Sequence, residues 1–305
     1  MTEVGWVVTV IGRDGIKDAL GPVAAILKKH GLGVEGIEPL SGAQGASGYA
    51  CAAFHAGGVI RDEALMRTEL SALADEIAID VAVQRLSERR QQRRLFVFDM
   101  DSTLIQGETI DELAKLAGVG EQVSAITALA MRGEIEFQES FRRRVALLGG
   151  LSETKVLEVI ERLPLMEGAE RLFRTLKTRG AKTAILSGGF SFFGEILKEK
   201  LGADYVFANE LDIRDGFVTG EVRGRIVDGA RKAELLVEIA GREGIPLEQV
   251  VAVGDGANDL PMLGLAGMGV AFHAKPVVRA SARFSMTHVG LDGLLYLLGV
   301  PDWEW

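Results

Sequence analysis

The chain is short of several features, and each shortage narrows what the protein can be. A single cysteine, Cys51, permits no disulfide within the chain, and we interpret it as a buried structural thiol in a reducing compartment. The 34 Lys and Arg residues are outnumbered by 43 Asp and Glu residues, and the net charge of −9 argues against a dedicated nucleic-acid binder. No stretch stays apolar for the ~18 residues that a membrane span needs. Glu3 stands where a signal peptide has positive charge, so we expect a soluble, cytoplasmic protein.

Several common catalytic motifs are also missing. The four histidines form neither an HExxH motif nor a close pair, so the sequence indicates no zinc site. There is no Gly-x-Ser-x-Gly elbow and no P-loop lysine motif. Zinc, serine-hydrolase and P-loop chemistry therefore have no support in the sequence.

What the sequence does contain fits two α/β domains. A length of 305 residues exceeds a typical domain of ~100–200 residues, and 48% apolar residues are enough for buried cores. The arginine-rich stretch Ser87–Arg94 is typical of a solvated linker, although it could also suggest a nucleic-acid site. We place the domain boundary there, between residues 1–88 and residues 89–305.

The first domain has the predicted element order βαββαβ, which is the split-βαβ, ferredoxin-like arrangement. Its predicted elements are strands Trp6–Ile11, Val34–Pro39, Tyr49–Phe54 and Ile79–Leu86, a helix with Ile16, Leu20, Val23 and Leu27 on one face, and a helix Asp62–Glu76 with the period of Leu65, Glu69 and Leu73. The Gly/Ser-rich segment Ser41–Gly48 joins two strands. Together with the turn Gly12-Arg13-Asp14-Gly15, this order resembles the ACT family of small regulatory domains. The resemblance implies a regulatory or dimerisation domain, a homodimer, and serine as a candidate ligand.

The second domain is predicted to be a doubly wound parallel sheet with helices on both faces. The expected strands are Leu95–Asp99, Lys182–Ser187, Tyr205–Ala208, Val250–Gly254 and Met268–Phe272. Roughly 75 residues of helical pattern separate the first two strands, which predicts an inserted helical cap at about residues 107–165. Asp215-Gly216 between apolar residues predicts a hairpin over Asp212–Glu221. The ligand site of such a sheet lies at the carboxyl ends of its strands.

The first of these strands ends in two aspartates one residue apart, Asp99 and Asp101. Alternate residues of an extended strand face the same way, so their carboxylates could converge, and Asp255 would join them from a neighbouring parallel strand. Crowded carboxylates repel, a divalent cation relieves the repulsion, and oxygen ligands favour Mg²⁺. A single Asp at a strand end is more often a turn or a helix cap, so the prediction depends on the three together.

Two further motifs suit a phosphate group. Ser187-Gly188-Gly189 ends a predicted strand before a helix, where a hydroxyl and free backbone N–H groups form an anion site. Lys232 can act as a point charge for phosphate. Alone, the first is usually a turn and the second a surface lysine. Three strand ends in this chain order, however, supply what phosphoryl transfer requires.

The combined motifs resemble those of the haloacid dehalogenase superfamily, and more narrowly its phosphoserine phosphatase family, over about residues 95–290. The segments that carry the resemblance are Asp99–Thr103, Ser187–Phe190, Lys232, Gly254–Asp259, and in the cap Gly107–Thr109 and Phe137–Val145. The resemblance implies Mg²⁺-dependent hydrolysis of O-phospho-L-serine to L-serine and phosphate through an aspartyl-phosphate. That reaction would be the last step of L-serine biosynthesis.

The resemblance also implies roles for individual residues. Asp99 would be the nucleophile and Asp101 the general acid and base, and Mg²⁺ would bind Asp99, Asp255 and the backbone carbonyl of Asp101. The implied substrate contacts are Glu108 for the ammonium, Arg144 for the carboxylate, Ser187, Gly188 and Lys232 for the phosphate, and Asn258 for the bound substrate. Asp259 would orient Lys232 or a metal-bound water.

Three alternatives stay open. The same core fits a phosphatase for another small monoester, or a phosphotransferase to another alcohol. The first domain could make the chain an amino-acid sensor whose phosphatase core is secondary or silent. Asp99 could also be a receiver-type phosphoacceptor, which Asp101 disfavours because an adjacent acid and base would shorten the life of the acyl phosphate.

Overall fold

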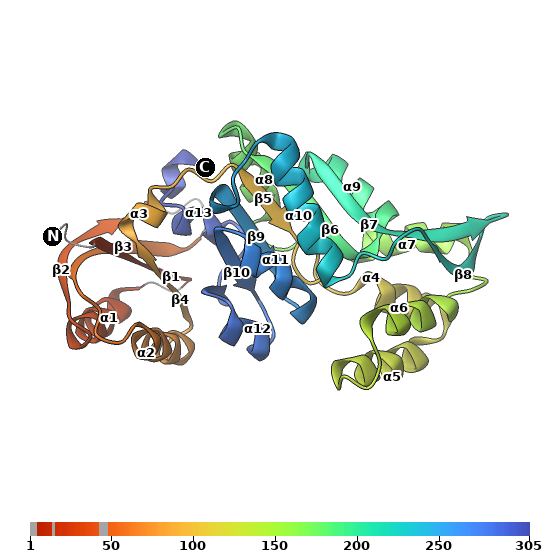
Figure 1. The fold of residues 1–305 in the computed structure, drawn as a ribbon, viewed down its shortest axis with the longest axis horizontal. Helices are drawn as coiled ribbons and strands as arrows, with labels where there is room; N and C mark the ends of the chain where they lie inside the picture. The colour runs from red at the N-terminus through yellow and green to blue at the C-terminus, as the bar shows by residue number, and fades with distance from the viewer. Residues whose placement is uncertain (1–4, 14–15, 43–47) are drawn as a thin grey trace.

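The computed structural model describes residues 5–13, 16–42 and 48–305, and its strands form two sheets (Figure 1). The first sheet has the order β2-β3-β1-β4, and the second has the order β11-β10-β9-β5-β6-β7-β8. Asp14 and Gly15 of the predicted first turn, and residues 43–47 of the predicted connector, lie outside the described residues.

The first sheet is antiparallel and carries two helices on one face. Its elements are β1 (Gly5–Gly12), α1 (Lys17–Lys29), β2 (Leu32–Pro39), β3 (Ala50–Gly58), α2 (Glu63–Glu76) and β4 (Ile79–Arg85). The predicted βαββαβ order is therefore confirmed. Apolar residues of β1 and β3, such as Val8 and Phe54, pack against Val23 and Leu27 of α1. This small core lies between the sheet and its helices.

Helix α2 turns a different face inward from the one its sequence predicted. The buried residues are Met66, Leu70 and Ala74, whereas Leu65 is about half exposed. Both sets repeat at helical spacing, so the sequence pattern predicts the helix but not which of its faces meets the sheet. Packing against the sheet decides between the two faces.

The second sheet is parallel except for its last strand, as the doubly wound prediction requires. Its strands are β5 (Leu95–Phe98), β6 (Lys182–Phe190), β7 (Tyr205–Arg214), β8 (Phe217–Arg223), β9 (Val250–Gly254), β10 (Met268–Phe272) and β11 (Phe284–Met286). The main helices around it are α8 (Ala169–Thr178), α9 (Ser191–Leu201), α10 (Gly229–Glu243) and α11 (Leu260–Leu265). Shorter helices are α3 (Leu86–Arg89), α12 (Pro276–Ser281) and α13 (Gly293–Leu297), with three 3₁₀ turns at Leu247–Gln249, Ala257–Asp259 and Asp302–Glu304.

The predicted hairpin joins β7 to β8. Its two turn residues, Asp215 with φ 51° and Gly216 with φ 78°, adopt the left-handed conformation that two-residue hairpin turns favour. In Figure 1 the β7–β8 hairpin extends beyond the other strands of the sheet. Its turn contacts the segment between two cap helices, where Glu153 N–H donates to the carbonyl of Gly216 at 2.9 Å. There Gly150 N–H donates to the carbonyl of Val218 at 2.8 Å.

Five helices lie between β5 and β6 in the described chain, and the four that precede α8 form the helical cap that the sequence predicted. The cap helices are α4 (Thr109–Ala117), α5 (Gly120–Met131), α6 (Phe137–Ala146) and α7 (Glu153–Arg162). In Figure 1 the cap and the first sheet lie at opposite ends of the molecule. The two chain segments that lead into and out of the cap meet at an antiparallel bridge between Ile105 and Leu165.

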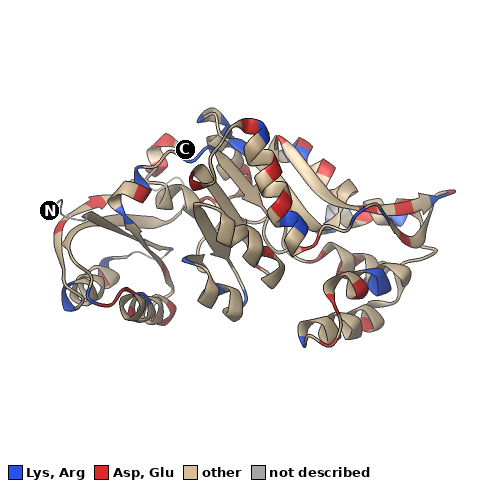
Figure 2. Cartoon of the chain, viewed as in Figure 1, with Lys and Arg blue, Asp and Glu red and all other residues tan. Residues whose placement is uncertain are grey.

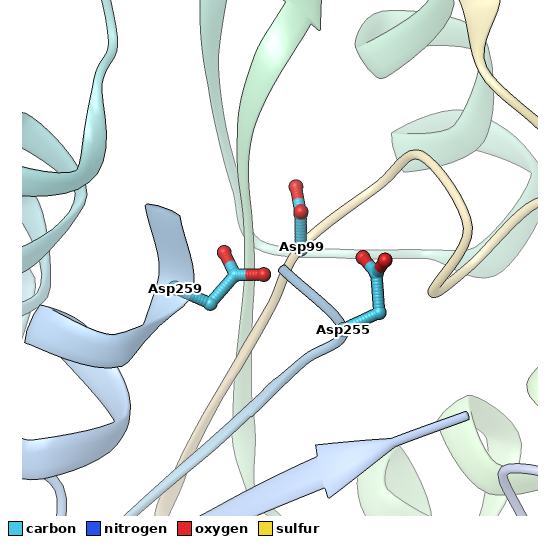
Figure 3. Close-up of side chains that lie close together, drawn as sticks. All are labelled: Asp99, Asp255 and Asp259. Atoms are coloured by element: carbon cyan, nitrogen blue, oxygen red, sulfur yellow. The ribbon is translucent and has the colours of Figure 1, made fainter. Parts of the chain in front are cut away.

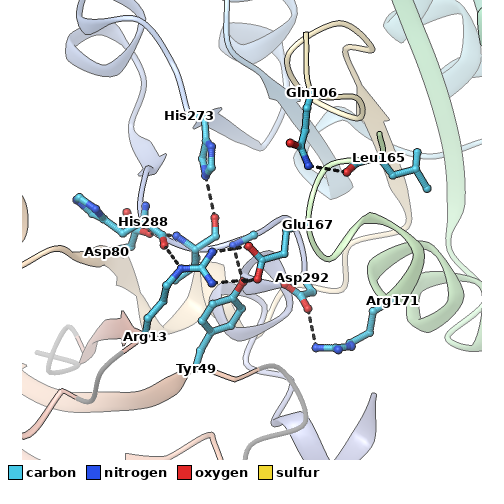
Figure 4. A network of polar contacts seen from close by, with 12 residues as sticks. Arg13, Tyr49, Asp80, Gln106, Leu165, Glu167, Arg171, His273, His288 and Asp292 are labelled. Atoms are coloured by element: carbon cyan, nitrogen blue, oxygen red, sulfur yellow. Dashed lines mark hydrogen bonds and ion pairs between the residues drawn. The ribbon is translucent and has the colours of Figure 1, made fainter. Parts of the chain in front are cut away.

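Polar contacts join the first sheet to the rest of the chain (Figure 4). The Asp80 carboxylate accepts the N–H groups of residues 287–289 at 2.7, 2.9 and 3.2 Å. Arg13 donates to both carboxylate oxygens of Glu167, and the Tyr49 hydroxyl donates to the same carboxylate at 2.8 Å. Glu167 follows Leu165 closely, so the first domain contacts the base of the cap. The boundary at residue 88 stays a prediction.

The outer surfaces carry both signs of charge side by side (Figure 2). Along α10, for example, Arg231 pairs with Glu234 at 3.0 Å. Among the described residues, no helix is long and apolar enough to cross a membrane. Cys51 is buried, as predicted.

Candidate active site

The carboxyl ends of β5 and β9 bring three aspartates together (Figure 3). The two strands pair in parallel with Phe98 opposite Val253, so Asp99 and Asp255 follow at the same edge of the sheet. One oxygen atom each from Asp99, Asp255 and Asp259 all lie within 4.8 Å of one another, and all three residues are buried. The structure thus brings Asp99 and Asp255 together, as the strand pattern predicts.

The crowded carboxyls resist ionisation. Burial raises the pKa of Asp99 well above its ordinary value, and the charges of Asp259 and Asp255 raise it further against the opposing effect of Lys232. Burial also raises the pKa of Asp255 to about 7, with added contributions from the charges of Asp259 and Glu108. A cation relieves such repulsion, and a donor set made only of oxygens suits Mg²⁺. The residues present therefore fit the predicted metal.

Lys232 is the cation that the chain itself places among these acids. Its side chain is fully buried, and Nζ lies 2.7 Å from Asp99 Oδ1 and 2.8 Å from Asp259 Oδ1. Burial alone would lower the pKa of Lys232, but the two carboxylates outweigh burial and raise the pKa, so the amine stays charged. If Asp259 orients Lys232, as the resemblance implies, the two side chains must be in contact, and they are. Helix α10 presents the lysine one turn after its N-cap, Asp228.

The Asp101 carboxylate is held by the cap. It accepts the N–H of Thr109 at 2.9 Å, and the Thr109 hydroxyl lies 3.3 Å from its other oxygen. Burial raises the pKa of Asp101 to about 7, the charge of Glu108 adds to the shift, and the Thr109 bonds oppose it. A carboxyl whose pKa is raised this far exchanges its proton more readily near neutral pH than an ordinary aspartate does. It can therefore give and take a proton, as a general acid and base must.

The Ser187-Gly188-Gly189 segment differs from its prediction. Strand β6 continues through it to Phe190, and α9 begins only at Ser191, so these N–H groups do not belong to the first turn of a helix. The N–H of Gly189 donates to the hydroxyl of Ser187 at 2.8 Å and is not free. The strand continues because Phe190 pairs with β7 again after the irregular segment. The anion-binding role of the Gly188 N–H stays a prediction.

A cavity of about 730 Å³ lies between this edge of the sheet and the cap. The predicted residues that line it are Asp99, Asp101, Gly188, Asp255 and Asn258 from the sheet side, and Glu108 and Arg144 from the cap side. Ser187 and Lys232 are fully buried and do not line the cavity. Lys232 contacts Asp99, which does line the cavity.

Glu108 and Arg144 give the cavity side chains of opposite charge. Glu108 accepts the Ser102 hydroxyl at 3.0 Å. Arg144 is partly buried, and its hydrogen bonds to other described residues are long, 3.4 Å to a backbone carbonyl of its own helix and 3.5 Å to the Thr127 hydroxyl. Burial lowers the pKa of Arg144, while the charges of Asp111 and Glu108 oppose that shift. A ligand that carries an ammonium and a carboxylate would satisfy both side chains.

The cavity-lining residues that the sequence analysis missed include Asp111, Thr127, Met131 and Lys275. Two of them had a positional signal. Asp111 lies three residues after Glu108, and Lys275 follows the carboxyl end of β10. Thr127 and Met131 had none, because the packing of the cap decides which face of α5 meets the cavity.

Comparisons with known proteins show which family the chain resembles. Residues 96–264 match the family model for haloacid dehalogenase-like hydrolases. The phosphoserine phosphatase of Archaeoglobus fulgidus is 49% identical over 79% of this chain and 70% of its own length. That of Streptomyces coelicolor is 44% identical over 97% of this chain and 71% of its own length. A solved structure of a phospho-aspartyl intermediate analogue of phosphoserine phosphatase is 46% identical, covers 68% of this chain and 99% of that chain, and has a TM-score of 0.64.

The chain belongs to the haloacid dehalogenase-like hydrolases. Within that family it groups with the phosphoserine phosphatases, and it is an enzyme, a hydrolase. The resemblance inferred from the motifs is thereby confirmed. The roles of individual residues stay predictions.

Proposed function

We propose that this enzyme hydrolyses O-phospho-L-serine to L-serine and inorganic phosphate through an aspartyl-phosphate. One observation carries the proposal: buried Asp99, in contact with Lys232, faces the same cavity as Glu108 and Arg144. Phosphoserine carries a phosphate, an ammonium and a carboxylate. The cavity offers Asp99 as a nucleophile for the phosphate, the negatively charged Glu108 for the ammonium, and the positively charged Arg144 for the carboxylate.

Mg²⁺ is the proposed cofactor. The carboxylates of Asp99 and Asp255 and the backbone carbonyl of Asp101 would hold it, and the raised pKa values of Asp99 and Asp255 support a cation there. When bound, the cation supplies Lewis-acid stabilisation of the charge on the transferring phosphoryl group.

The covalent step begins at Asp99. Its carboxylate attacks phosphorus in line, the bond from phosphorus to the serine oxygen breaks, and an aspartyl-phosphate forms. Asp101 protonates the departing serine oxygen, then takes a proton from the water that hydrolyses the intermediate. Hydrolysis of a phosphate monoester is so slow without a catalyst that the barrier must fall by ~20 kcal/mol or more.

The other site residues bind and orient the substrate. The Ser187 hydroxyl, the Gly188 N–H and Lys232 stabilise the equatorial phosphoryl oxygens, where charge collects in the transition state. Asn258 contacts the bound substrate from the loop after β9. Gly188 and Asn258 line the cavity, whereas the assignments of the buried Ser187 and Lys232 rest on the family match.

Selectivity for phosphoserine comes from the cap. Glu108 meets the substrate ammonium, and Arg144 binds its carboxylate with two parallel N–H donors. Phe137 forms a wall of the cavity and excludes water when the cap closes. The phosphatases named above, which are 44% and 49% identical to this chain, support this substrate.

The remaining parts of the proposal concern the whole protein. Residues 1–88 form a regulatory and dimerisation domain with serine as its candidate ligand, and residues 89–305 form the phosphatase domain. The enzyme works in the cytoplasm as a homodimer, at the last step of L-serine biosynthesis.

Phosphate release from a panel of substrates tests the proposed function. The panel contains phosphoserine, phosphothreonine, phosphotyrosine and p-nitrophenyl phosphate at matched concentrations, with and without Mg²⁺. We expect the highest kcat/KM for phosphoserine, loss of activity in EDTA, and recovery when Mg²⁺ is restored. Equal rates on all four substrates would refute selectivity for phosphoserine, and full activity in EDTA would refute the cofactor.

A further inference from the structure

We infer that Asn209 is a positioning residue for phosphoryl transfer. Its buried side-chain amide holds the anion-binding segment Ser187–Gly189 and the start of the Lys232 helix in one fixed arrangement. The inference deepens the proposed function and rests on it. Asn209 lies on β7 and is 1% exposed.

Both halves of the Asn209 amide are used. Its Nδ2 donates to the carbonyl of Gly188 at 2.8 Å, and its Oδ1 accepts the N–H of Val227 at 2.8 Å. A backbone carbonyl can only accept and a backbone N–H can only donate, so these partners fix the orientation of the amide. Asn209 is not one of the described residues that line the cavity. It therefore acts indirectly, through the segments of Gly188 and Val227 that its amide connects.

The first of these segments departs from regular pairing. Leu186 pairs with Phe207 and Phe190 pairs with Asn209, so Ser187, Gly188 and Gly189 lie opposite Ala208 alone. The two extra residues must bulge from the ladder, and a bulge needs its own partners to keep one shape. Strand pairing alone leaves this segment undetermined.

Hydrogen bonds at both ends hold the peptide plane between Gly188 and Gly189. Its carbonyl accepts from Asn209, and its N–H donates to the Ser187 hydroxyl at 2.8 Å. If this peptide turned over, the Gly188 carbonyl could face the bound phosphate and repel it. The Asn209 donor therefore keeps an oxygen away from the anion and sets the direction of the neighbouring Gly188 N–H.

The second segment leads directly to Lys232. Val227 precedes Asp228, the N-cap of α10, whose carboxylate accepts the N–H of Arg231 at 2.9 Å. Lys232 N–H donates to the carbonyl of Asp228 at 2.9 Å in the first turn of that helix. By fixing Val227, Asn209 also fixes where α10 begins, and thereby the position of the Lys232 side chain relative to the anion-binding segment. A single amide thus sets the spacing of the two segments, Ser187–Gly189 and the start of the Lys232 helix, to which the proposed function assigns the phosphoryl oxygens.

An ionised carboxylate cannot do both tasks. Ionised aspartate has only acceptors, so Asn209→Asp in that form would place two oxygens against each other at the Gly188 carbonyl. Alanine removes both bonds and leaves a buried carbonyl and a buried N–H without partners. These two variants therefore disturb the arrangement in different ways and are expected to change the same functional quantities.

Steady-state kinetics of Asn209→Asp and Asn209→Ala test the inference, with phosphoserine and p-nitrophenyl phosphate as substrates. We expect kcat/KM to fall about 100-fold on both substrates, the loss that a misplacement of about 1 Å can cause. We also expect the competitive inhibition constant of inorganic phosphate to rise about tenfold, because the anion site itself is disturbed. A residue that only stabilises the fold would lower the active fraction without changing that constant.

Thr183→Val is the matched control. Thr183 is a buried polar residue at the opposite end of the same pair of strands, where its hydroxyl donates to Asp204 at 3.4 Å. This variant loses a buried hydrogen bond but should keep the wild-type inhibition constant and substrate kinetics. Wild-type values for the inhibition constant and for kcat/KM in folded Asn209 variants would overturn the inference. If wild-type protein hydrolyses only p-nitrophenyl phosphate, the proposed substrate is wrong while the test of Asn209 still holds.

If neither Asn209 variant folds, nuclear magnetic resonance of the ¹⁵N-labelled wild-type protein decides. Titration with inorganic phosphate in the presence of Mg²⁺ should shift the side-chain amide signals of Asn209 together with the backbone signals of Gly188. Unchanged Asn209 signals at saturating phosphate would refute the positioning role.

Discussion

At the scale of single residues, Asp99 combines two properties that a nucleophile of this kind needs. It is buried among Asp255, Asp259 and Lys232. Its ionised form is therefore destabilised in the metal-free protein, and a bound metal ion would stabilise that form for attack on phosphorus. Its backbone N–H donates to the Val253 carbonyl at 2.9 Å, which keeps the side chain at the end of the strand. The residue is therefore fixed in position before substrate arrives.

Asp99→Asn should abolish turnover without harm to the fold. The amide has nearly the same shape but cannot attack phosphorus, so kcat should fall by about 10⁴-fold or more. The loss of one charge from a crowded acidic cluster should leave the melting temperature of the metal-free protein unchanged or raised. Phosphate release and a thermal melt followed by circular dichroism check both expectations. Turnover within tenfold of wild type would show that Asp99 is not the nucleophile.

Arg144→Ala should weaken recognition of the substrate carboxylate without affecting the reaction at the phosphate. Removal of a charged hydrogen-bond partner in a partly buried site costs about 3 kcal/mol, which corresponds to roughly 100-fold in kcat/KM for phosphoserine. Kinetics on p-nitrophenyl phosphate, which has no carboxylate, should change less than about threefold.

Arg143→Ala is the control for that experiment. Arg143 lies on the same helix, is exposed, and pairs with Glu139 at 2.7 Å on the solvent side. An exposed pair of this kind contributes little, so both substrates should keep wild-type kinetics. Equal losses on phosphoserine and p-nitrophenyl phosphate in Arg144→Ala would contradict its role as the carboxylate ligand.

Some residues of the site were predictable and others were not, for a physical reason. Asp99 and Asp255 follow apolar strands, and parallel strands end at a common edge, so local pattern alone brings them together. Asn209 lies inside a strand, and its function depends on the register between β6 and β7 and on a loop that follows much later. No local pattern records such a relation. The same holds for Thr127, whose helix position gives no sign of the cavity.

At the scale of elements, the sequence predicted strands and helices better than their ends and faces. β6 was expected to stop at Ser187 because Gly188-Gly189 is typical of a turn, yet the strand continues to Phe190, whose pairing with β7 outweighs the local preference. Strand β7 likewise extends from the expected Ala208 to Arg214, where the hairpin turn begins. Pairing partners decide these ends, and a single sequence does not reveal them.

Asp228→Ala tests how the start of α10 supports the site. Loss of the N-cap should cost about 1 kcal/mol, or about 3 °C in melting temperature. Because Lys232 lies in the first turn of the same helix, we expect kcat/KM to fall about tenfold as well. The Asp228 carboxylate also accepts from Gln138 of the cap at 2.6 Å, so part of this loss belongs to the contact between cap and sheet.

Asp62→Ala provides the comparison. Asp62 is the N-cap of α2 in the first domain and accepts the N–H of Leu65 at 2.9 Å, so it loses the same kind of hydrogen bond. Its melting temperature should fall by a similar amount while the kinetics stay at wild-type values. A similar loss of activity in Asp62→Ala would mean that general destabilisation, and not the position of Lys232, explains the effect of Asp228→Ala.

At the scale of the whole molecule, two distant regions of the chain meet at the base of the cap. The first domain contacts Glu167 through Arg13 and Tyr49 (Figure 4). Glu167 directly follows the segment that returns from the cap, where Gln106 donates to the carbonyl of Leu165 at 2.9 Å. The hydrogen bond from Arg13 holds the pKa of Glu167 below its ordinary value, and the one from Tyr49 adds to this effect. These contacts therefore persist at neutral pH and weaken only as pH falls below about 4.5.

The acidic cluster has the opposite dependence on pH. The pKa values of Asp101 and Asp255 are raised to about 7, chiefly by burial, and that of Asp99 is also raised. A carboxyl with a raised pKa binds its proton more tightly in the folded state than in the unfolded chain. Its contribution to stability is present below its ordinary pKa of about 4 and is lost as pH rises through 7. Without metal, the folded protein should therefore become less stable from pH 5 to pH 8.

Mg²⁺ should reverse this loss, because the cation binds the ionised carboxylates of the folded state alone. We expect the melting temperature of metal-free protein to fall by several degrees between pH 5 and pH 8, as the shifted carboxyls ionise. At pH 8, Mg²⁺ at about 100 times its dissociation constant should raise the melting temperature by about 5–10 °C, and at pH 5 by much less. Differential scanning calorimetry at both pH values, with EDTA or Mg²⁺, measures these four melting temperatures.

Asp255→Asn should flatten the pH dependence of the melting temperature and remove most of the Mg²⁺ effect, whereas Asp215→Asn, in the exposed hairpin turn, should match wild type. A melting temperature that rises with pH without metal, or an undiminished Mg²⁺ shift in Asp255→Asn, would refute a metal site at this cluster.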